Sequence, residues 1–175
     1  MSASSIQNLL LTSITAANIC VYDASVSKKE LFGMGTTVVA AVVSGDTLVV
    51  AHAGDSRAYV FDGELRAVTR DHSVVQEMVD AGSITAAEAR SHPVKNYITR
   101  ALGVEERIEI DFCEATLSGG EKILLCSDGL TNYVSEEAIG EILREFPTEF
   151  IPQRLIEAAN AGGGGDNVTA AVISV

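Results

Sequence analysis

The sequence predicts an α+β fold in which strands stack as a sandwich and helices cover it. Two observations support this class. A chain of 175 residues with 47% hydrophobic residues is large and apolar enough for one packed domain. Strand-like runs also follow one another, as do helical segments, instead of alternating singly. We therefore expect an antiparallel sandwich rather than a doubly wound parallel sheet.

The first half of the chain predicts one helix and two hairpins. Apolar residues recur at three- and four-residue steps from Ile6 to Ala17, which indicates a packing helix without caps. Two β-rich runs then flank Ser44-Gly45-Asp46, and a second pair flanks Asp62-Gly63. We expect these runs to form an antiparallel meander.

The second half predicts two short helices, two strands, two longer helices and a last strand. Capping-box patterns open the short helices at Ser73 and Thr85. Residues 107–117 alternate like a strand, whereas the run at 122–127 does not alternate, which predicts a strand buried on both faces. The later elements are marked by a cap at Ser135, a first-turn proline at Pro152 and the β-rich run 168–175.

The composition indicates which kinds of binding partner and which cellular compartment to expect. A net charge of −12, from 24 acidic and 12 basic residues, argues against nucleic-acid binding, which needs basic surface. Cys20, Cys113 and Cys126 are an odd number of widely spaced cysteines, which favours a reducing compartment. The first basic residue is Lys28, and no apolar run approaches the ~20 residues of a membrane span. We expect a cytoplasmic protein with no membrane or nucleic-acid partner.

Three acids stand where a β-rich run meets a turn or glycine, namely Asp55, Asp128 and Asp166. Small neighbours leave room for solvent and backbone around a carboxylate, as a hard divalent cation requires. Because no histidine or cysteine cluster accompanies these acids, Mg²⁺ or Mn²⁺ is favoured over zinc. The alternative is that each is a turn residue. Asp128 is the best candidate, because it follows a buried run and needs a partner.

Other reactive side chains give weaker signals, and we assign no catalytic residue in this chain. Cys126 lies in an apolar strand and is expected to be core. Of the three histidines, His72 has the best chance to meet a phosphate, although a role at helix entry next to Ser73 is favoured for it. Arg57 is expected to pair with carboxylates at strand ends, and Arg100 stays unassigned between pairing and substrate binding.

Five blocks in a fixed order resemble the metal-dependent protein phosphatases of the PP2C family, bacterial branch: GMGTT (33–37), AHAGDSRAY (51–59), TRDHS to ITRALG (69–103), ILLCSDGL (123–130) and GGDNVTAAV (164–172). The resemblance implies two antiparallel sheets flanked by helices, a two-metal centre, and hydrolysis of phosphoserine and phosphothreonine in protein substrates. It implies that Asp128 and Asp166 bind the first metal and that Asp55 shares a third, weaker metal with Asp128. Residues 72–100 look like the helical flap beside the active site, within a single domain 1–175.

The family's first motifs, R-x-x-N-E-D and D-G-x-G-G, do not precede the opening helix here. They carry the phosphate-binding arginine, a glutamate ligand and the aspartate that bridges the two catalytic metals. We therefore expect an N-terminally truncated phosphatase with little or no activity, because a two-metal site needs both ions at fixed separation. Uncovered sheet edges favour strand exchange or a homodimer. The alternatives are a non-catalytic relative that acts as a binding or regulatory module, and an unrelated metal-binding α+β domain.

Overall fold

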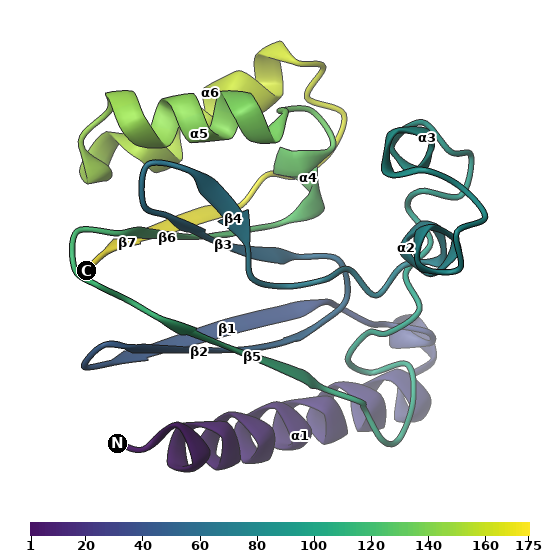
Figure 1. Ribbon diagram of the computed structural model, residues 1–175. Helices are drawn as coiled ribbons and strands as arrows, with labels where there is room; N and C mark the ends of the chain where they lie inside the picture. The colour runs from purple at the N-terminus through teal and green to yellow at the C-terminus, as the bar shows by residue number, and fades with distance from the viewer.

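Two antiparallel β-sheets lie face to face between helical layers in the computed structural model, which describes residues 1–175 (Figure 1). One sheet has the strand order β1-β2-β5 and the other β4-β3-β6-β7. Helix α1 covers the outer face of the first sheet, and α5 and α6 cover the second. The predicted sandwich flanked by helices is therefore confirmed.

Helix α1 (Ala3–Ser27) forms the first layer. It is capped, contrary to the sequence analysis, because the Ser2 hydroxyl accepts a hydrogen bond from the Ser5 N–H. It is also, by length and composition, the one helix apolar enough to cross a membrane, so the expectation that no such run exists is wrong. Its buried residues Ile6, Leu10 and Ile14 pack on Val49, Ala51 and Ala53 of β2, which face away from the second sheet. The short 3₁₀ helix η1 (Lys29–Leu31) follows.

The first sheet consists of β1 (Val38–Ser44), β2 (Thr47–Ala53) and β5 (Asp111–Thr116). Ser44 pairs with Thr47, so Gly45 and Asp46 form a two-residue turn, in which Gly45 takes the positive φ of 64° that glycine tolerates. Strand β2 is central and almost wholly buried, and β5 pairs with its other edge, with Val50 opposite Cys113. The predicted hairpin is confirmed, but the predicted meander is wrong, because β2 and β3 lie in different sheets.

The second sheet consists of β3 (Arg57–Phe61), β4 (Leu65–Ala67), β6 (Lys122–Cys126) and β7 (Ala170–Ser174). Ile123 of β6 faces the first sheet and packs with Leu48 and Val50. Leu124 and Cys126 face the opposite way, into the helices. Strand β6 is therefore covered on both sides, as its unalternating sequence predicts.

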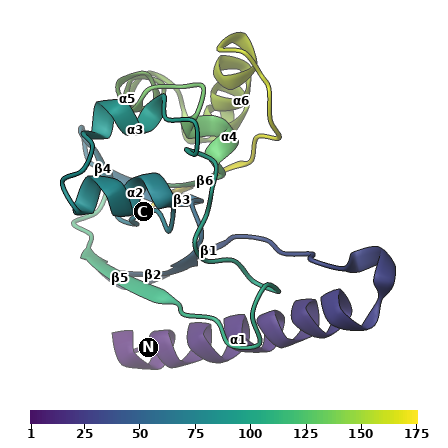
Figure 2. The same ribbon diagram turned by 90° about the vertical axis from the view of Figure 1, so that its right-hand side faces the viewer.

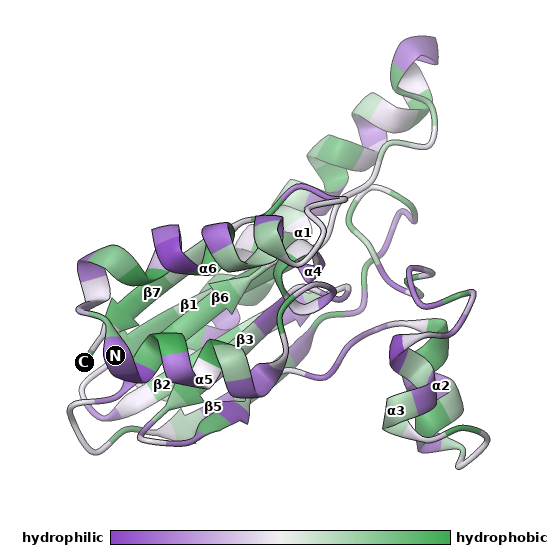
Figure 3. Cartoon of the chain, turned by 90° about the horizontal axis from the view of Figure 1, so that it is seen from above, coloured by the Kyte–Doolittle hydropathy of each residue, from purple (hydrophilic) through white to green (hydrophobic).

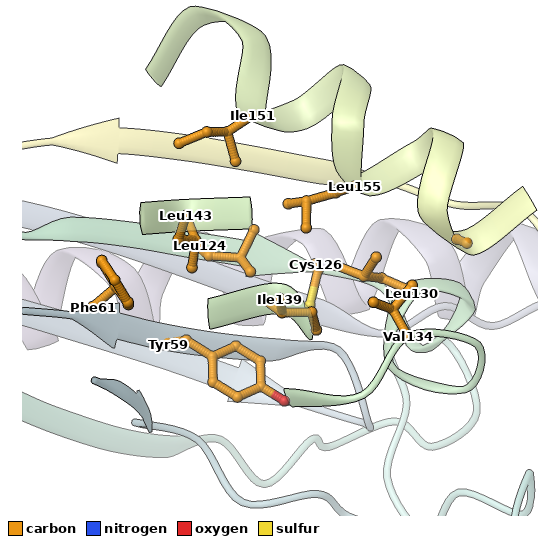
Figure 4. Close-up of a cluster of buried hydrophobic side chains, with 11 residues drawn as sticks. Tyr59, Phe61, Leu124, Cys126, Leu130, Val134, Ile139, Leu143, Ile151 and Leu155 are labelled. Carbon is orange, nitrogen blue, oxygen red and sulfur yellow. The ribbon is translucent and has the colours of Figure 1, made fainter. Parts of the chain in front are cut away.

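Three α-helices cover the second sheet: α4 (Asp128–Thr131), α5 (Glu136–Glu145) and α6 (Ile151–Ala161), with the 3₁₀ helix η2 (Thr148–Phe150) before α6. Ser135 caps α5 by accepting from the Ala138 N–H, as predicted. Figure 4 shows how Ile139, Leu143 and Leu155 of these helices meet Leu124 and Cys126 of the sheet. This is the largest apolar cluster in the molecule.

Residues 72–100, which we name the flap segment, stand beside the sandwich and hold α2 (Val74–Asp80) and α3 (Ala86–Arg90) (Figures 2 and 3). The capping box at Thr85 and Glu88 is complete. At Ser73 only half of the predicted box forms, because the Gln76 side chain bonds to Asp80 instead of reaching back. The two legs of the segment are joined by backbone hydrogen bonds from Val74 N–H to Tyr97 O (2.9 Å) and from Thr99 N–H to His72 O (2.8 Å).

Candidate metal centre

Asp55 and Asp128 meet because of the strand register. Arg57 pairs with Cys126 in the antiparallel pair β3 and β6. Asp55 lies two residues before Arg57 and Asp128 two residues after Cys126, so both acids extend from the same end of the pair. Residues 54–56 also cross from β2 in one sheet to β3 in the other, so Asp55 is not in a hairpin turn.

The glycines beside these acids are required by close packing. Gly54 has a φ of +111°, and a Cβ there would lie 2.4 Å from Thr37 Cγ2. A Cβ on Gly129 would lie 2.2 Å from the carbonyl oxygen of Asn167. The lack of a side chain at Gly129 lets the segment with Asp166 approach the start of α4, and hydrogen bonds between Ser127 and Thr169 hold the two segments together. Two acids that are distant in sequence thus come into one neighbourhood.

Asp55 and Asp128 lie in a locally negative environment, in which Arg57 offsets only part of the repulsion. Burial raises the pKa of Asp55 to about 6, and repulsion from Asp128 adds to the effect. Burial, followed by repulsion from Asp166, also raises the pKa of Asp128. None of the three forms an ion pair with lysine or arginine, and the one side-chain donor to Asp128 is the Asn132 amide, at 3.1 Å. A bound cation would relieve this repulsion.

The three acids differ in exposure and do not form a closed cage. Asp55 and Asp128 are half-buried, whereas Asp166 is exposed and accepts a hydrogen bond from the Asn167 N–H. Their carboxylate oxygens do not all come within 4.8 Å of one another. The residues fit a hydrated cation with oxygen ligands, held mainly by Asp55 and Asp128, with Asp166 at its edge.

A cavity of about 500 Å³ opens beside Asp55 and Asp128 and reaches the flap segment. Among its lining residues are four basic side chains: Arg57, Arg70, Arg90 and Lys95. Arg70 pairs with Asp80, whereas Arg90 and Lys95 form no ion pair. The cavity thus has an acidic end on the sandwich and a basic wall on the flap segment.

Arg57 lines this cavity but is held by Asp71. Its Nε and Nη2 donate to the two oxygens of that carboxylate, both at 2.7 Å, and its Nη1 donates to the Tyr59 hydroxyl at 3.1 Å. Burial opposes the charge of Arg57, but the hydrogen bonds to Asp71 outweigh it and raise the pKa of the guanidinium. This supports the interpretation of Arg57 as a partner for carboxylates.

Cys126 and His72 are both removed from the cavity. Burial raises the pKa of the Cys126 thiol to about 12, which keeps it protonated and agrees with a core role. His72 is buried; its Nδ1 accepts from the Gly54 N–H, and its Nε2 contacts Asp111. His72 does not line the cavity, so the structure does not support a direct contact between His72 and a phosphate bound there.

A second polar cluster has members that are far apart in the chain, so no local sequence pattern predicts it. His52, His72 and Asp111 bring three ligating atoms within 4.8 Å. The two imidazole rings are stacked, with centroids 4.7 Å apart and planes 9° from parallel. A metal must lie near the plane of each imidazole it binds, and parallel stacked rings have no common plane. Arg100 also already supplies a cation to Asp111, at 2.7 Å.

Known proteins resemble this chain in sequence and in structure. A family model described as "Protein phosphatase 2C" matches residues 3–158. The serine/threonine phosphatase stp of Listeria monocytogenes is 39% identical over 177 residues, covering 99% of this chain and 69% of the relative. The crystal structure of Stp1 from Staphylococcus aureus superposes with a TM-score of 0.95 at 34% identity, covering 100% of this chain and 70% of that one.

A second similar structure contains metal. The catalytic domain of the phosphatase PstP in complex with 2 manganese ions has a TM-score of 0.84 and 40% identity, covering 93% of this chain and 68% of that chain. The fold is therefore shared with these phosphatases, and this chain spans about two thirds of their length.

Proposed function

The chain belongs to the protein phosphatase 2C family, and we propose from this that it serves the metal-dependent hydrolysis of phosphoserine and phosphothreonine in proteins. The observation that carries the proposal is the pair Asp55 and Asp128, which share one cavity wall and have no cationic partner. The family enzymes are phosphatases, and manganese in the PstP structure agrees with the expected Mn²⁺ or Mg²⁺.

Asp128, Asp166 and Asp55 are the proposed metal ligands. Divalent ions in such a site supply an activated water and neutralise charge on the phosphoryl group. The protein itself contributes hard oxygen ligands, a half-buried position that strengthens electrostatic attraction, and hydrogen-bond support from Asn132. Residues 72–100 are the proposed flap, which borders the cavity.

We further propose that these 175 residues alone have little or no turnover. Phosphoryl transfer depends on ligands and donors held at fixed positions. Here the three carboxylates do not converge within 4.8 Å, and Arg57, the arginine nearest to them in sequence, is engaged by Asp71. The second candidate function is a non-catalytic module that binds phosphoproteins. It is favoured by Arg90 and Lys95, two basic residues on the cavity wall that are available to bind a phosphate group.

The proposed partners are phosphorylated proteins and a second copy of the chain. Strand β7 is an edge strand, and its Ile173 is 41% exposed although the neighbouring Ile123 is fully buried. Pairing between β7 strands of two chains would cover this apolar edge. Light scattering tests it: a monomer at high concentration contradicts the homodimer. The three cysteines form no disulfide, which supports the proposed cytoplasmic location.

Isothermal titration with Mn²⁺ tests the site directly. The chain is compared with Asp128→Ala, Asp55→Ala and Asp166→Ala, and every sample is then assayed with p-nitrophenyl phosphate. Asp46→Ala is the matched control, because Asp46 is an exposed acid in the hairpin turn at the other end of β2. We expect weaker binding in the first three variants, unchanged binding in the control, and no turnover. Turnover that needs Asp128 would overturn the proposed inactivity, and unchanged binding in all variants would overturn the site.

A further inference from the structure

The base of the flap segment is held by four polar side chains, which we name the flap-base cluster: His52, His72, Arg100 and Asp111. His72 opens the flap segment and Arg100 closes it, while His52 belongs to β2 and Asp111 to β5. None of the four lines the cavity beside the proposed metal ligands. The cluster therefore connects the flap segment to the first sheet.

His72 is fixed on both sides of its ring. Its Nδ1 accepts a hydrogen bond from the Gly54 N–H at 3.2 Å, so the proton of the neutral ring lies on Nε2. That nitrogen donates to Asp111 Oδ2 at 3.1 Å, and Arg100 Nη1 lies 3.2 Å from it. The backbone N–H of His72 also donates to the Gly54 carbonyl at 2.9 Å. Two reciprocal hydrogen bonds thus tie the first residue of the flap segment to the residue before Asp55.

Asp111 receives the other end of the flap segment as well. Arg100 Nη1 donates to Asp111 Oδ1 at 2.7 Å, and Arg100 Nη2 lies 3.2 Å from Glu109. Asp111 therefore binds both legs of the segment, one through each carboxylate oxygen. The legs are also joined by the backbone hydrogen bond from Thr99 N–H to His72 O.

His52 supports this arrangement by packing against the face of the His72 ring. It is 1% exposed, and its ring stacks on that of His72. Stacking confines the His72 ring to one plane, and in that plane its two nitrogens point at Gly54 and Asp111. The cluster has no need of a metal, because Arg100 already neutralises Asp111.

We propose that His72, Asp111 and Arg100 are positioning residues which close the base of the flap segment and, through Gly54, fix the loop that holds Asp55. The consequence for metal binding rests on the proposed function of Asp55. The closure of the flap base does not, because it follows from the contacts alone. Movement of the flap legs and placement of Asp55 are then coupled through a single imidazole.

Amide hydrogen exchange of the full chain, followed by NMR, tests the proposal. In Asp111→Asn we expect exchange at Val74, Thr99 and Gly54 to become about tenfold faster or more, as for the loss of a hydrogen bond to a charged group. The core amide of Leu124 is expected to keep its rate. Equal acceleration at Leu124 would indicate global destabilisation and overturn the proposal, as would unchanged rates at all three sites. Asp62→Asn is the matched control, because it breaks an exposed pair with Arg66.

Two substitutions at His72 separate its two hydrogen bonds. An asparagine can replace the Nδ1 acceptor and a glutamine the Nε2 donor. We expect His72→Asn to protect Gly54 and release Thr99, and His72→Gln to do the opposite. Identical exchange patterns in the two variants would contradict the separate roles of the nitrogens.

Mn²⁺ titration of the same variants tests the link to Asp55. We expect His72→Gln to weaken binding several-fold and His72→Asn to retain it. Faster exchange at Gly54 with unchanged Mn²⁺ affinity would overturn the link. If the unmodified chain binds no Mn²⁺, the proposed function fails, while the exchange rates still decide the closure of the flap base.

Discussion

Asp55 and Asp128 lie opposite one another, each two residues beyond the paired positions Arg57 and Cys126 at one end of β3 and β6. The register of a single strand pair therefore brings together two carboxylates that are more than seventy positions apart in the sequence. Their mutual repulsion and partial burial store unfavourable energy in the metal-free protein. Several consequences of this pairing are measurable.

The stability of the metal-free chain is expected to fall as pH rises from about 4 to about 6. The folded-state pKa of Asp55 is about 6, against an ordinary value of 3.8, so the folded state binds the proton more tightly than the unfolded state. The stabilisation is present while Asp55 is protonated and is lost as it ionises. After allowance for solvent screening, its size is about 1 kcal/mol. Urea unfolding in chelator, with Asp55→Asn as the reference, measures it. A constant difference between the two proteins across this range would contradict the prediction.

Mn²⁺ affinity is expected to decrease below pH about 6, because protons compete for Asp55. Titrations at pH 5.5 and 7.5 should differ by several-fold in dissociation constant. The proton release that accompanies binding, measured by titration in buffers of different ionisation enthalpy, should be smaller in Asp55→Asn, because Asp128, whose pKa is also raised, is then the remaining source of protons. Equal affinity at both pH values would show that Asp55 does not contact the ion.

Gly129→Ala is expected to destabilise the chain by about 1 to 3 kcal/mol, because the new Cβ would meet the Asn167 carbonyl. It should also displace Asp166 from Asp128 and weaken Mn²⁺ binding. Gly140→Ala is the matched control within α5, since the nearest atom to its Cβ is Leu65 Cβ at 3.8 Å. Helix propensity predicts that this control is more stable by up to about 1 kcal/mol. A stable Gly129→Ala protein in urea unfolding would refute the close contact.

Thiol labelling is expected to distinguish Cys20 from Cys126. Cys20 is exposed on α1, whereas Cys126 is buried and its thiol pKa is raised to about 12. A disulfide reagent at neutral pH should modify Cys20 in the native protein and Cys126 only after denaturation. Cys20→Ser provides the control. When labelling of this native variant is followed by mass spectrometry, the fast phase should be absent. Rapid modification of Cys126 in the native state would mean that the second sheet opens readily.

Local signals in the sequence predicted most elements. The glycine turn at Gly45 and the capping box at Thr85 and Glu88 depend on a few adjacent residues, and both formed as expected. The cap of α1 at Ser2 was missed, and so was the reach of Gln76 to Asp80, because each depends on which of several short-range hydrogen bonds wins.

Features that depend on tertiary structure could not be predicted from the sequence. A bend of three residues between β2 and β3 looks like a hairpin turn, yet it carries the chain from one sheet to the other. The carboxylates around Asp128 were recognised because each follows a strand. The contacts of His52 and Asp111 were not, because they lie on paired strands β2 and β5 that are about sixty residues apart. No local pattern reports such a pairing.

The double attachment of the flap segment to Asp111 makes this region modular. The two legs pair at Ser73 and Ile98, next to their anchors His72 and Arg100. The chain between these positions therefore contributes little to the strand pairing of the sandwich. Its length and sequence can change while the anchor stays the same. Replacement of the flap segment alone can therefore give such a protein a new cavity wall, while the carboxylates and the two sheets stay in place.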